Sequence, residues 1–132
     1  YVSLHRSEGF GLTIAEAMSA GKPVIATAYS GNMDFMTSGN SYLVKYDLVE
    51  IEQDYGPYKK GWFWAEPDVY DSSKLMRYVY ENKEQAEYVG RIAAEYIQRY
   101  YNPKIIGKIY KQRLNRIREN KYGISLLSKL RF

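Results

Sequence analysis

Two glutamates around a glycine-rich turn are the residues best placed to do chemistry in this chain. Glu8 precedes Gly9-Phe10-Gly11, and Glu16 lies about one turn into the helical pattern that follows. Glycine lets backbone N–H groups approach a ligand closely, and the start of a helix attracts anions. Carboxylates accept strong hydrogen bonds from hydroxyl groups. The arrangement suits a ligand with an anionic middle and hydroxylated ends, which is the form of a sugar nucleotide.

The spacing also allows a structural role, because a carboxylate near a helix start can simply complement the helix dipole. A glycosidase is disfavoured, since Glu8 and Glu16 would address opposite ends of one ligand. A retaining glycosidase instead brings its two carboxyl groups to about 5–5.5 Å on one bond. His5, at the end of the first expected strand, is a candidate ligand residue, with a packed histidine as the alternative. For Arg6 a solvated role is favoured.

Three short buried strands are expected around this turn, at residues 1–5, 23–27 and 42–46, from their apolar and β-branched residues. A helix from Leu12 to Ala20 joins the first strand to the second, and a short helical piece at 33–37 joins the second to the third. This order predicts an α/β fold with a partial doubly wound, Rossmann-like parallel sheet. The turn that carries Glu8 would then lie at the carboxyl edge of the sheet.

The remainder is predicted to be mostly helical, with helices from Asp71 or Ser72 to about Asn82, from Glu84 to Tyr101 and from Pro103 to about Asn120. Their inward-facing stripes are expected to be Leu75, Met76, Val79 and Tyr80, then Ala86, Val89, Ala93, Tyr96, Ile97 and Tyr100, then Ile106, Tyr110, Leu114 and Ile117. The aromatic run Trp62-Phe63-Trp64 is interpreted as packing, with stacking on an acceptor as the alternative. The expected organisation is an α/β part at 1–69, a helical C-terminal segment at 70–121 and a tail at 122–132.

The composition excludes several classes of site. The 132 residues contain no cysteine and one histidine, so a disulfide framework, a thiolate nucleophile and a multi-histidine metal site are ruled out. The length allows one domain or a piece of a larger one, and because the chain opens directly on a strand we expect it to begin within a domain. The sequence contains neither a membrane-spanning run nor a signal peptide, and a cytoplasmic location is expected.

Positive charge is concentrated near the C-terminus. Residues 1–98 carry 9 basic and 14 acidic side chains, whereas residues 99–132 carry 10 basic side chains and one acidic side chain, a net charge of +9. A basic segment attracts phosphate-rich surfaces, so a module that binds anionic lipid or nucleic acid is an alternative to an enzyme. A solvated helix face is the simpler interpretation, and the expected buried stripe of the last helix argues against nucleic acid.

The run from Ser3 to Thr27, SLHRSEGFGLTIAEAMSAGKPVIAT, resembles the signature of retaining GT-B glycosyltransferases. The similarity is to glycosyltransferase family 4 (glycosyl transferase group 1) in particular. The hallmark of that family is a glutamate pair around Gly-Phe-Gly, then Glu-Ala-Met, a small residue, Gly, any residue and Pro-Val-Ile-Ala. A looser similarity extends through residues 30–34, 42–44 and 64–68 into the helical part, so that it covers most of the chain.

The resemblance implies a role for each residue of the turn. Glu8 matches the catalytic glutamate placed against the donor sugar, and Glu16 matches the glutamate that binds the ribose hydroxyls. The segment whose backbone N–H groups bind sugar and phosphate matches Gly9, Phe10, Gly11 and Leu12. The chain departs from the family after the second strand, where the family usually has Gly-Gly followed by Pro-Glu. Here the run is Ser30-Gly31-Asn32-Met33-Asp34, with Asp34 in place of the glutamate.

The activity implied by the resemblance is transfer of a sugar from a nucleotide-sugar donor to an acceptor hydroxyl, with retention of anomeric configuration and without a metal or a cofactor. The acceptor would be a saccharide, a lipid-linked group or a protein. The N-terminal acceptor domain of the family, and the Arg and Lys that neutralise the leaving diphosphate, are expected to lie outside this sequence, so the chain is expected to be inactive alone. Alternatives on the same fold are a sugar-nucleotide epimerase and a phosphorylase. Contact of the basic segment with the inner face of a membrane would fit a lipid-linked acceptor, and residues 103–120 are expected to be loose or to make dimer contacts if they lack their partner domain.

Overall fold

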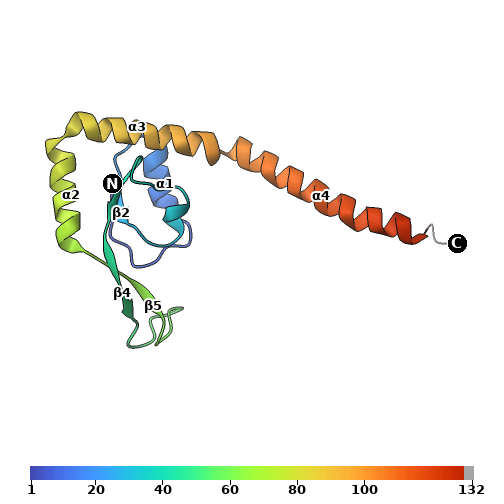
Figure 1. The fold of residues 1–132 in the computed structure, drawn as a ribbon, viewed down its shortest axis with the longest axis horizontal. Helices are drawn as coiled ribbons and strands as arrows, with labels where there is room; N and C mark the ends of the chain where they lie inside the picture. The colour runs from blue at the N-terminus through green and yellow to red at the C-terminus, as the bar shows by residue number, and fades with distance from the viewer. Residues whose placement is uncertain (130–132) are drawn as a thin grey trace. The chain divides into compact units, whose positions relative to one another are not determined.

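A computed structural model describes the backbone of residues 1–129 and the side chains of residues 1–120. The chain divides into two units, Tyr1–Gln98 and Arg99–Phe132 (Figure 1). The elements in chain order are β1 (Val2–Ser3), α1 (Leu12–Ser19), β2 (Ile25–Thr27), the 3₁₀ helix η1 (Gly31–Asp34), β3 (Tyr42–Val44), β4 (Tyr46–Glu50), β5 (Phe63–Pro67), α2 (Val69–Glu81), α3 (Lys83–Tyr100) and α4 (Pro103–Lys129).

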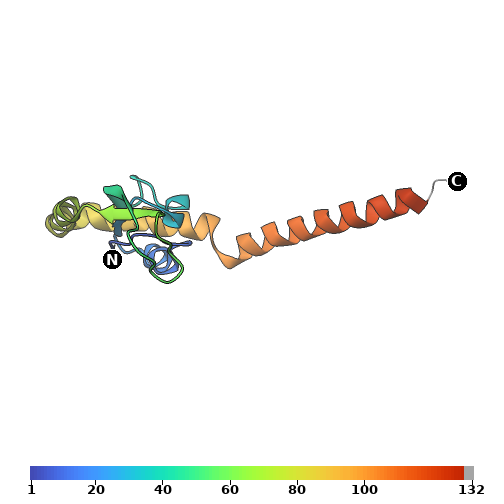
Figure 2. The same cartoon turned by 90° about the horizontal axis from the view of Figure 1, so that it is seen from below.

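A parallel sheet forms the centre of the first unit and confirms the predicted fold class. Its strand order is β1-β2-β3, with Val2 opposite Ile25 and Ile25 opposite Tyr42. Helices α1 and α2 lie on opposite sides of this sheet, as both ribbon views show (Figures 1 and 2). The whole of β2 is buried, as expected for a strand covered on both faces. The sheet therefore has the doubly wound arrangement that the strand–helix order predicts.

Helix α1 is anchored by apolar residues that recur at helical spacing. Ile14, Ala15 and Met18 are buried, while the remaining face is exposed or half-exposed. The helix ends just before Gly21, whose φ of 69° lies in the left-handed region that favours glycine. Gly90 of α3 lies directly against this turn, because a Cβ at Gly90 would overlap the carbonyl oxygen of Gly21. Close backbone packing thus fixes α3 across the end of α1.

An antiparallel hairpin follows the sheet and was not predicted from the sequence. Strands β4 and β5 pair from Tyr46–Pro67 to Glu50–Phe63. The interpretation of the aromatic run as packing is wrong for two of its three residues, since Trp62 and Phe63 are 57% and 58% exposed. Trp64 is half-buried, with the rings of Tyr55 and Tyr58 at 5.4 and 5.9 Å. The pattern of aromatic residues predicts burial poorly here because only the inner side of a thin hairpin is covered.

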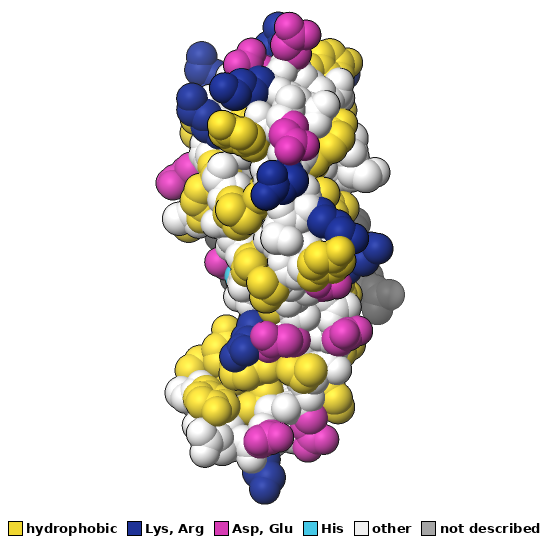
Figure 3. Space-filling model, turned by 90° about the vertical axis from the view of Figure 1, so that its left-hand side faces the viewer, with side chains coloured by type: hydrophobic (Ala, Val, Ile, Leu, Met, Phe, Trp, Pro, Cys, Tyr) yellow, Lys and Arg dark blue, Asp and Glu magenta, His cyan; other side chains and the backbone are white. Residues whose placement is uncertain are grey.

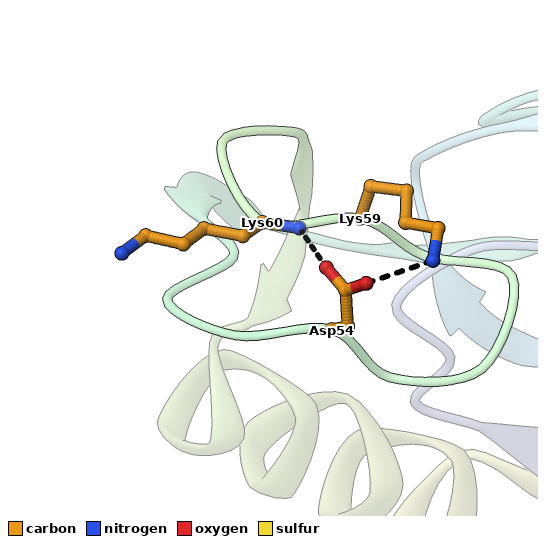
Figure 4. Close-up of polar contacts among 3 residues, drawn as sticks. All are labelled: Asp54, Lys59 and Lys60. Atoms are coloured by element: carbon orange, nitrogen blue, oxygen red, sulfur yellow. Dashed lines mark hydrogen bonds and ion pairs between the residues drawn. The ribbon is translucent and has the colours of Figure 1, made fainter.

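The loop between β4 and β5 is held by one carboxylate. Asp54 accepts hydrogen bonds from the Lys59 Nζ at 2.7 Å and from the Lys60 backbone N–H at 3.0 Å (Figure 4). The ammonium of Lys59, and after it the backbone N–H of Lys60, hold the pKa of Asp54 below its ordinary value. The contacts of the ionised carboxylate are therefore present above the ordinary pKa and are lost as the pH falls through the lowered one.

We expect Asp54→Asn to loosen this loop without affecting the rest of the fold, because the ion pair is solvent-exposed and such pairs contribute little to global stability. Amide hydrogen exchange should show lower protection of the Lys60 N–H in the variant at neutral pH, with an unchanged melting temperature. Lys59→Met, which removes only the side-chain partner, should give intermediate protection. Equal protection in all three proteins would show that the carboxylate does not hold the loop.

The helices of the first unit begin earlier and bury less than predicted. Asp68 caps α2 by accepting from the Asp71 N–H at 2.9 Å, so the cap lies three or four residues before its expected position at Asp71 or Ser72. Met76, Tyr80 and Tyr100, predicted to face inward, are exposed. Figure 3 shows hydrophobic side chains scattered among charged ones on the face that α2 presents. In α3 the predicted stripe is largely confirmed by burial of Ala86, Val89, Ala93 and Ile97.

The second unit consists mainly of α4. The predicted cap is confirmed, because the Asn102 Oδ1 accepts from the backbone N–H groups of Lys104 and Ile105 at 2.9 and 3.0 Å. The helix continues to Lys129, beyond its expected end near Asn120 and through most of the expected tail at 122–132, whose last three residues lie outside the described ones. The expected core stripe is wrong for Tyr110, Leu114 and Ile117, which are exposed. None of the described helices is both long enough and apolar enough to cross a membrane.

Candidate functional site

The loops that follow β1 and β2 meet at one edge of the sheet, because the carboxyl ends of parallel strands lie side by side. The first loop, residues 4–11, carries Glu8 and leads into α1. The second loop, residues 28–30, leads into η1. Glu8 is half-buried at the meeting point, and all the candidate residues of the sequence analysis lie on the first loop or on α1. This edge is the candidate site.

Hydrogen bonds to the second loop hold both polar backbone groups of Glu8, its N–H and its carbonyl oxygen. The Glu8 N–H donates to the Ser30 Oγ at 3.1 Å, and the Ser30 hydroxyl donates to the Glu8 carbonyl oxygen at 2.5 Å. The Gly31 N–H donates to the same carbonyl at 3.2 Å. Since none of these bonds uses the Glu8 carboxylate, the side chain keeps its acceptor capacity while its main chain is fixed.

The two loops touch so closely that one position admits only glycine. A Cβ at Gly31 would overlap the carbonyl oxygen of Gly9 and crowd the Cα of Phe10. The contact is backbone against backbone, so it cannot be relieved by turning a side chain. Gly31 is therefore the residue that allows the second loop to approach the turn after Glu8.

An aromatic pair anchors the glycine-rich turn in the core. The Phe10 ring packs on the fully buried ring of Phe35, with centroids 5.0 Å apart. Gly11 is buried and has a φ of 86°, a conformation in which a side chain is strained. Gly9 and Leu12, on either side, are exposed. The turn thus presents backbone to solvent while its aromatic residue is anchored in the core.

The start of α1 lies next to this turn and carries no side-chain cap. The N-cap is Gly11, which has no side chain to cap the helix, and the first turn within Leu12–Ser19 contains no acidic residue. Glu16 stands in the second turn, exposed and away from the buried face of Ile14 and Met18. The positive end of the helix dipole and its first N–H groups are therefore available to an anion, with one carboxylate before them and one after.

His5 is hydrogen-bonded within the protein at both ring nitrogens. Its Nε2 lies 3.0 Å from the Tyr29 carbonyl oxygen and 3.1 Å from the Asn32 Oδ1, and its Nδ1 lies 3.2 Å from the Ser3 Oγ. Both partners of Nε2 are acceptors, so this nitrogen carries the proton. His5 therefore joins the two loops through hydrogen bonds. Its direct contact with a ligand stays a prediction.

Asn32 completes the connection and was missed by the sequence analysis, as was Ser30. Asn32 is fully buried, and its Nδ2 donates to the Thr27 carbonyl oxygen at 3.0 Å. Two polar residues soon after a buried strand are a usable signal for a site at the carboxyl edge of a parallel sheet. That signal was present in Ser30 and Asn32, and only their partners on the first loop could not be foreseen.

Two other positions from the sequence analysis lie at the rim. Arg6 is exposed, pairs with Glu66 at 2.6 Å and stacks over the Trp64 ring at 4.8 Å. These contacts hold Arg6 against the hairpin, and the expected solvated role stays a prediction. Asp34, the substitute for the glutamate of the family pattern, is exposed at the end of η1. No group of three or more His, Asp or Glu side chains within the described residues could hold a metal ion.

Comparison with known families gives one result. The sequence profile described as glycosyl transferases group 1 matches residues 1–96, a span that contains the Glu8 turn, α1 and the Ser30–Gly31 loop. No protein with a curated description matches the chain.

Proposed function

Because this chain belongs to the glycosyl transferases group 1 family and so takes part in glycosyl transfer, we propose that it binds the nucleotide-sugar donor of a retaining hexosyltransferase. The observation that supports this most is the uncapped start of α1, which lies between Glu8 on a fastened loop and Glu16 on the helix. A diphosphate suits the helix start, and the hydroxylated ends of a sugar nucleotide suit the two carboxylates.

In this proposal each group acts on one part of the donor. The backbone N–H groups of Gly9 to Leu12 and the dipole of α1 hold the diphosphate and stabilise the negative charge that develops on it as the sugar departs. Glu8 accepts a hydrogen bond from a sugar hydroxyl, and Glu16 accepts from the ribose. His5 and Ser30 keep the two loops in register, so that the site is organised before the donor arrives.

We further propose that the chain supplies the donor-binding part of the transferase and is inactive by itself. Departure of a diphosphate calls for nearby cations, and the one arginine on the Glu8 loop, Arg6, is paired with Glu66. Cationic groups and the acceptor site would come from the rest of the transferase. The acceptor is a saccharide, a lipid-linked group or a protein, and the reaction runs in the cytoplasm without a metal or a cofactor.

The complete transferase should be assayed against UDP-glucose, UDP-N-acetylglucosamine and GDP-mannose, each with a labelled sugar. The expected result is one preferred donor whose sugar appears in a new glycoside, with the anomeric configuration of the donor retained when the product is read by NMR. A free epimerised sugar nucleotide would identify an epimerase, and a sugar 1-phosphate formed from a glycan and phosphate would identify a phosphorylase. An inverted linkage would contradict the proposed retention.

The exposed surface of α4 favours a second, compatible function, contact with an anionic lipid surface at the inner face of a membrane. Ile109, Tyr110, Leu114 and Ile117 are 46–67% exposed. Lys104, Lys108, Lys111 and Arg118 recur at a spacing that places them on another face of the helix, whereas Arg113 and Arg116 fall on the same side as these apolar residues. In this proposal the exposed apolar side chains enter the interface of the membrane, and the lysine and arginine side chains contact the anionic headgroups.

This contact predicts salt-sensitive binding to vesicles. The complete transferase should sediment with vesicles that contain phosphatidylserine but not with pure phosphatidylcholine vesicles, and about 1 M salt should release it because it shortens the Debye length to about 3 Å. Replacing Lys108, Lys111 and Arg118 by glutamate should abolish binding. The same change at Lys60, Lys74 and Arg91 in the first unit should not. Absence of binding to the phosphatidylserine vesicles would contradict the lipid contact, and binding that survives both salt and the first triple variant would contradict its electrostatic origin.

A further inference from the structure

Ser30 has a backbone conformation that side chains rarely adopt. Its φ is 81° and its ψ is −155°, and it is the one residue other than glycine with a positive φ among the described residues. This region of conformational space is populated almost only by glycine, and a residue with a side chain stays there only when its surroundings hold it in place. Contacts of Ser30 must therefore hold it in this conformation.

The hydroxyl of Ser30 is fully engaged with a single residue on the other loop. It accepts from the Glu8 N–H at 3.1 Å and donates to the Glu8 carbonyl oxygen at 2.5 Å. Both bonds bridge 22 positions of sequence, and the Gly31 N–H adds a third bond to the same carbonyl at 3.2 Å. The strained backbone therefore places the Ser30 hydroxyl where it can bind both the N–H and the carbonyl oxygen of Glu8.

We propose that Ser30 is a positioning residue that fixes the Glu8 carboxylate for the donor sugar by fastening the Glu8 main chain. This inference rests on the proposed function, in which Glu8 contacts the sugar. With the hydroxyl removed, the Glu8 N–H and carbonyl lose one partner each, and the turn samples orientations in which the carboxylate misses the sugar. Small displacements of a positioned group are costly because catalysis depends on preorganised geometry.

Three variants of the complete transferase separate positioning from mere stability. Ser30→Gly and Ser30→Ala both lack the hydroxyl, but only alanine keeps the strain, so the glycine variant should have the higher melting temperature of the two. Ser30→Thr keeps the hydroxyl and adds a β-branch at a positive φ, so its melting temperature should fall. The assay uses whichever of the three sugar nucleotides named above is the best donor.

Donor use should follow the hydroxyl and not the melting temperature. We expect kcat/KM for that donor to fall about tenfold in both Ser30→Gly and Ser30→Ala, the equivalent of about 1.4 kcal/mol of transition-state stabilisation. Ser30→Thr should stay near the parent value. Hydrogen exchange of the Glu8 amide, read at residue resolution, should be faster in the glycine and alanine variants and unchanged in the threonine variant.

The outcomes distinguish this inference from the proposed function. If Glu8→Gln impairs donor use while Ser30→Gly and Ser30→Ala do not, Glu8 keeps its role and the positioning by Ser30 is overturned. A kcat/KM that follows the melting temperature across the three Ser30 variants overturns it as well, since a merely structural role would act in that way. If Glu8→Gln itself has no effect, the proposed function fails first, and the inference fails with it.

Discussion

Replacing Glu8 by glutamine in the complete transferase is expected to lower kcat/KM for its sugar nucleotide about 10- to 100-fold. The amide keeps the shape of the side chain but loses the charge, and a charge-assisted hydrogen bond to a hydroxyl contributes about 1.5–3 kcal/mol. The melting temperature should not change, because the hydrogen bonds that fasten Glu8 use its backbone. The measurement is steady-state kinetics with the preferred donor at saturating acceptor.

Glu16→Gln provides the second half of this test and should act differently. In the proposed site Glu16 holds the ribose, which is remote from the reacting bond, so its loss should raise KM more than it lowers kcat. Glu87→Gln is the matched control, since Glu87 is also an exposed helical glutamate, on α3, and its replacement should have no effect. Kinetics that are unchanged in Glu8→Gln or in Glu16→Gln would remove that residue from the site.

Gly31→Ala is expected to damage both the fold and the site. The added Cβ would overlap the Gly9 carbonyl oxygen, and the two backbones would have to separate to accommodate it. Overpacking of this kind costs about 1–3 kcal/mol. The separation would also break the bonds from Ser30 and Gly31 to Glu8, so we expect donor use to fall further than the loss of stability alone would produce.

Thermal denaturation together with donor kinetics measures these two effects. Gly39→Ala is the control, because Gly39 is exposed and a Cβ there would make only an ordinary contact, 3.7 Å from the Thr37 Oγ1. That variant should match the parent protein in both measurements. A Gly31→Ala protein with parental melting temperature and donor use would show that the close approach of the two loops is not required.

The fold was predictable where local pattern and burial agree. Residues 24–27 are continuously apolar or β-branched and form a buried strand, and the stripe of α1 ends at a glycine that the backbone requires. The hairpin was not predicted, and the aromatic residues in it misled the prediction of burial, because Trp62 and Phe63 are exposed. The exposed stripe of α4 shows a further limit, since periodicity predicts an amphipathic helix without predicting what covers its apolar face.

The candidate site was also predictable only in part. Glu8, the glycines and Glu16 lie within one short run, so their types and spacing could be read from the sequence. The bonds of Ser30 to Glu8 and of Asn32 to His5 span 22 and 27 positions, and no local pattern predicts such pairings. Ser30 was also missed because its unusual feature is a positive φ, and the residue types of a Ser-Gly turn do not predict that conformation for the serine.

A crystal structure of the complete transferase with its preferred sugar nucleotide bound tests the central claim most directly. We predict that the diphosphate lies against the backbone N–H groups at the start of α1, with the Glu8 carboxylate within hydrogen-bond distance of a sugar hydroxyl and the Glu16 carboxylate on the ribose. A donor seated elsewhere on the protein, or one that neither carboxylate touches, would contradict the account.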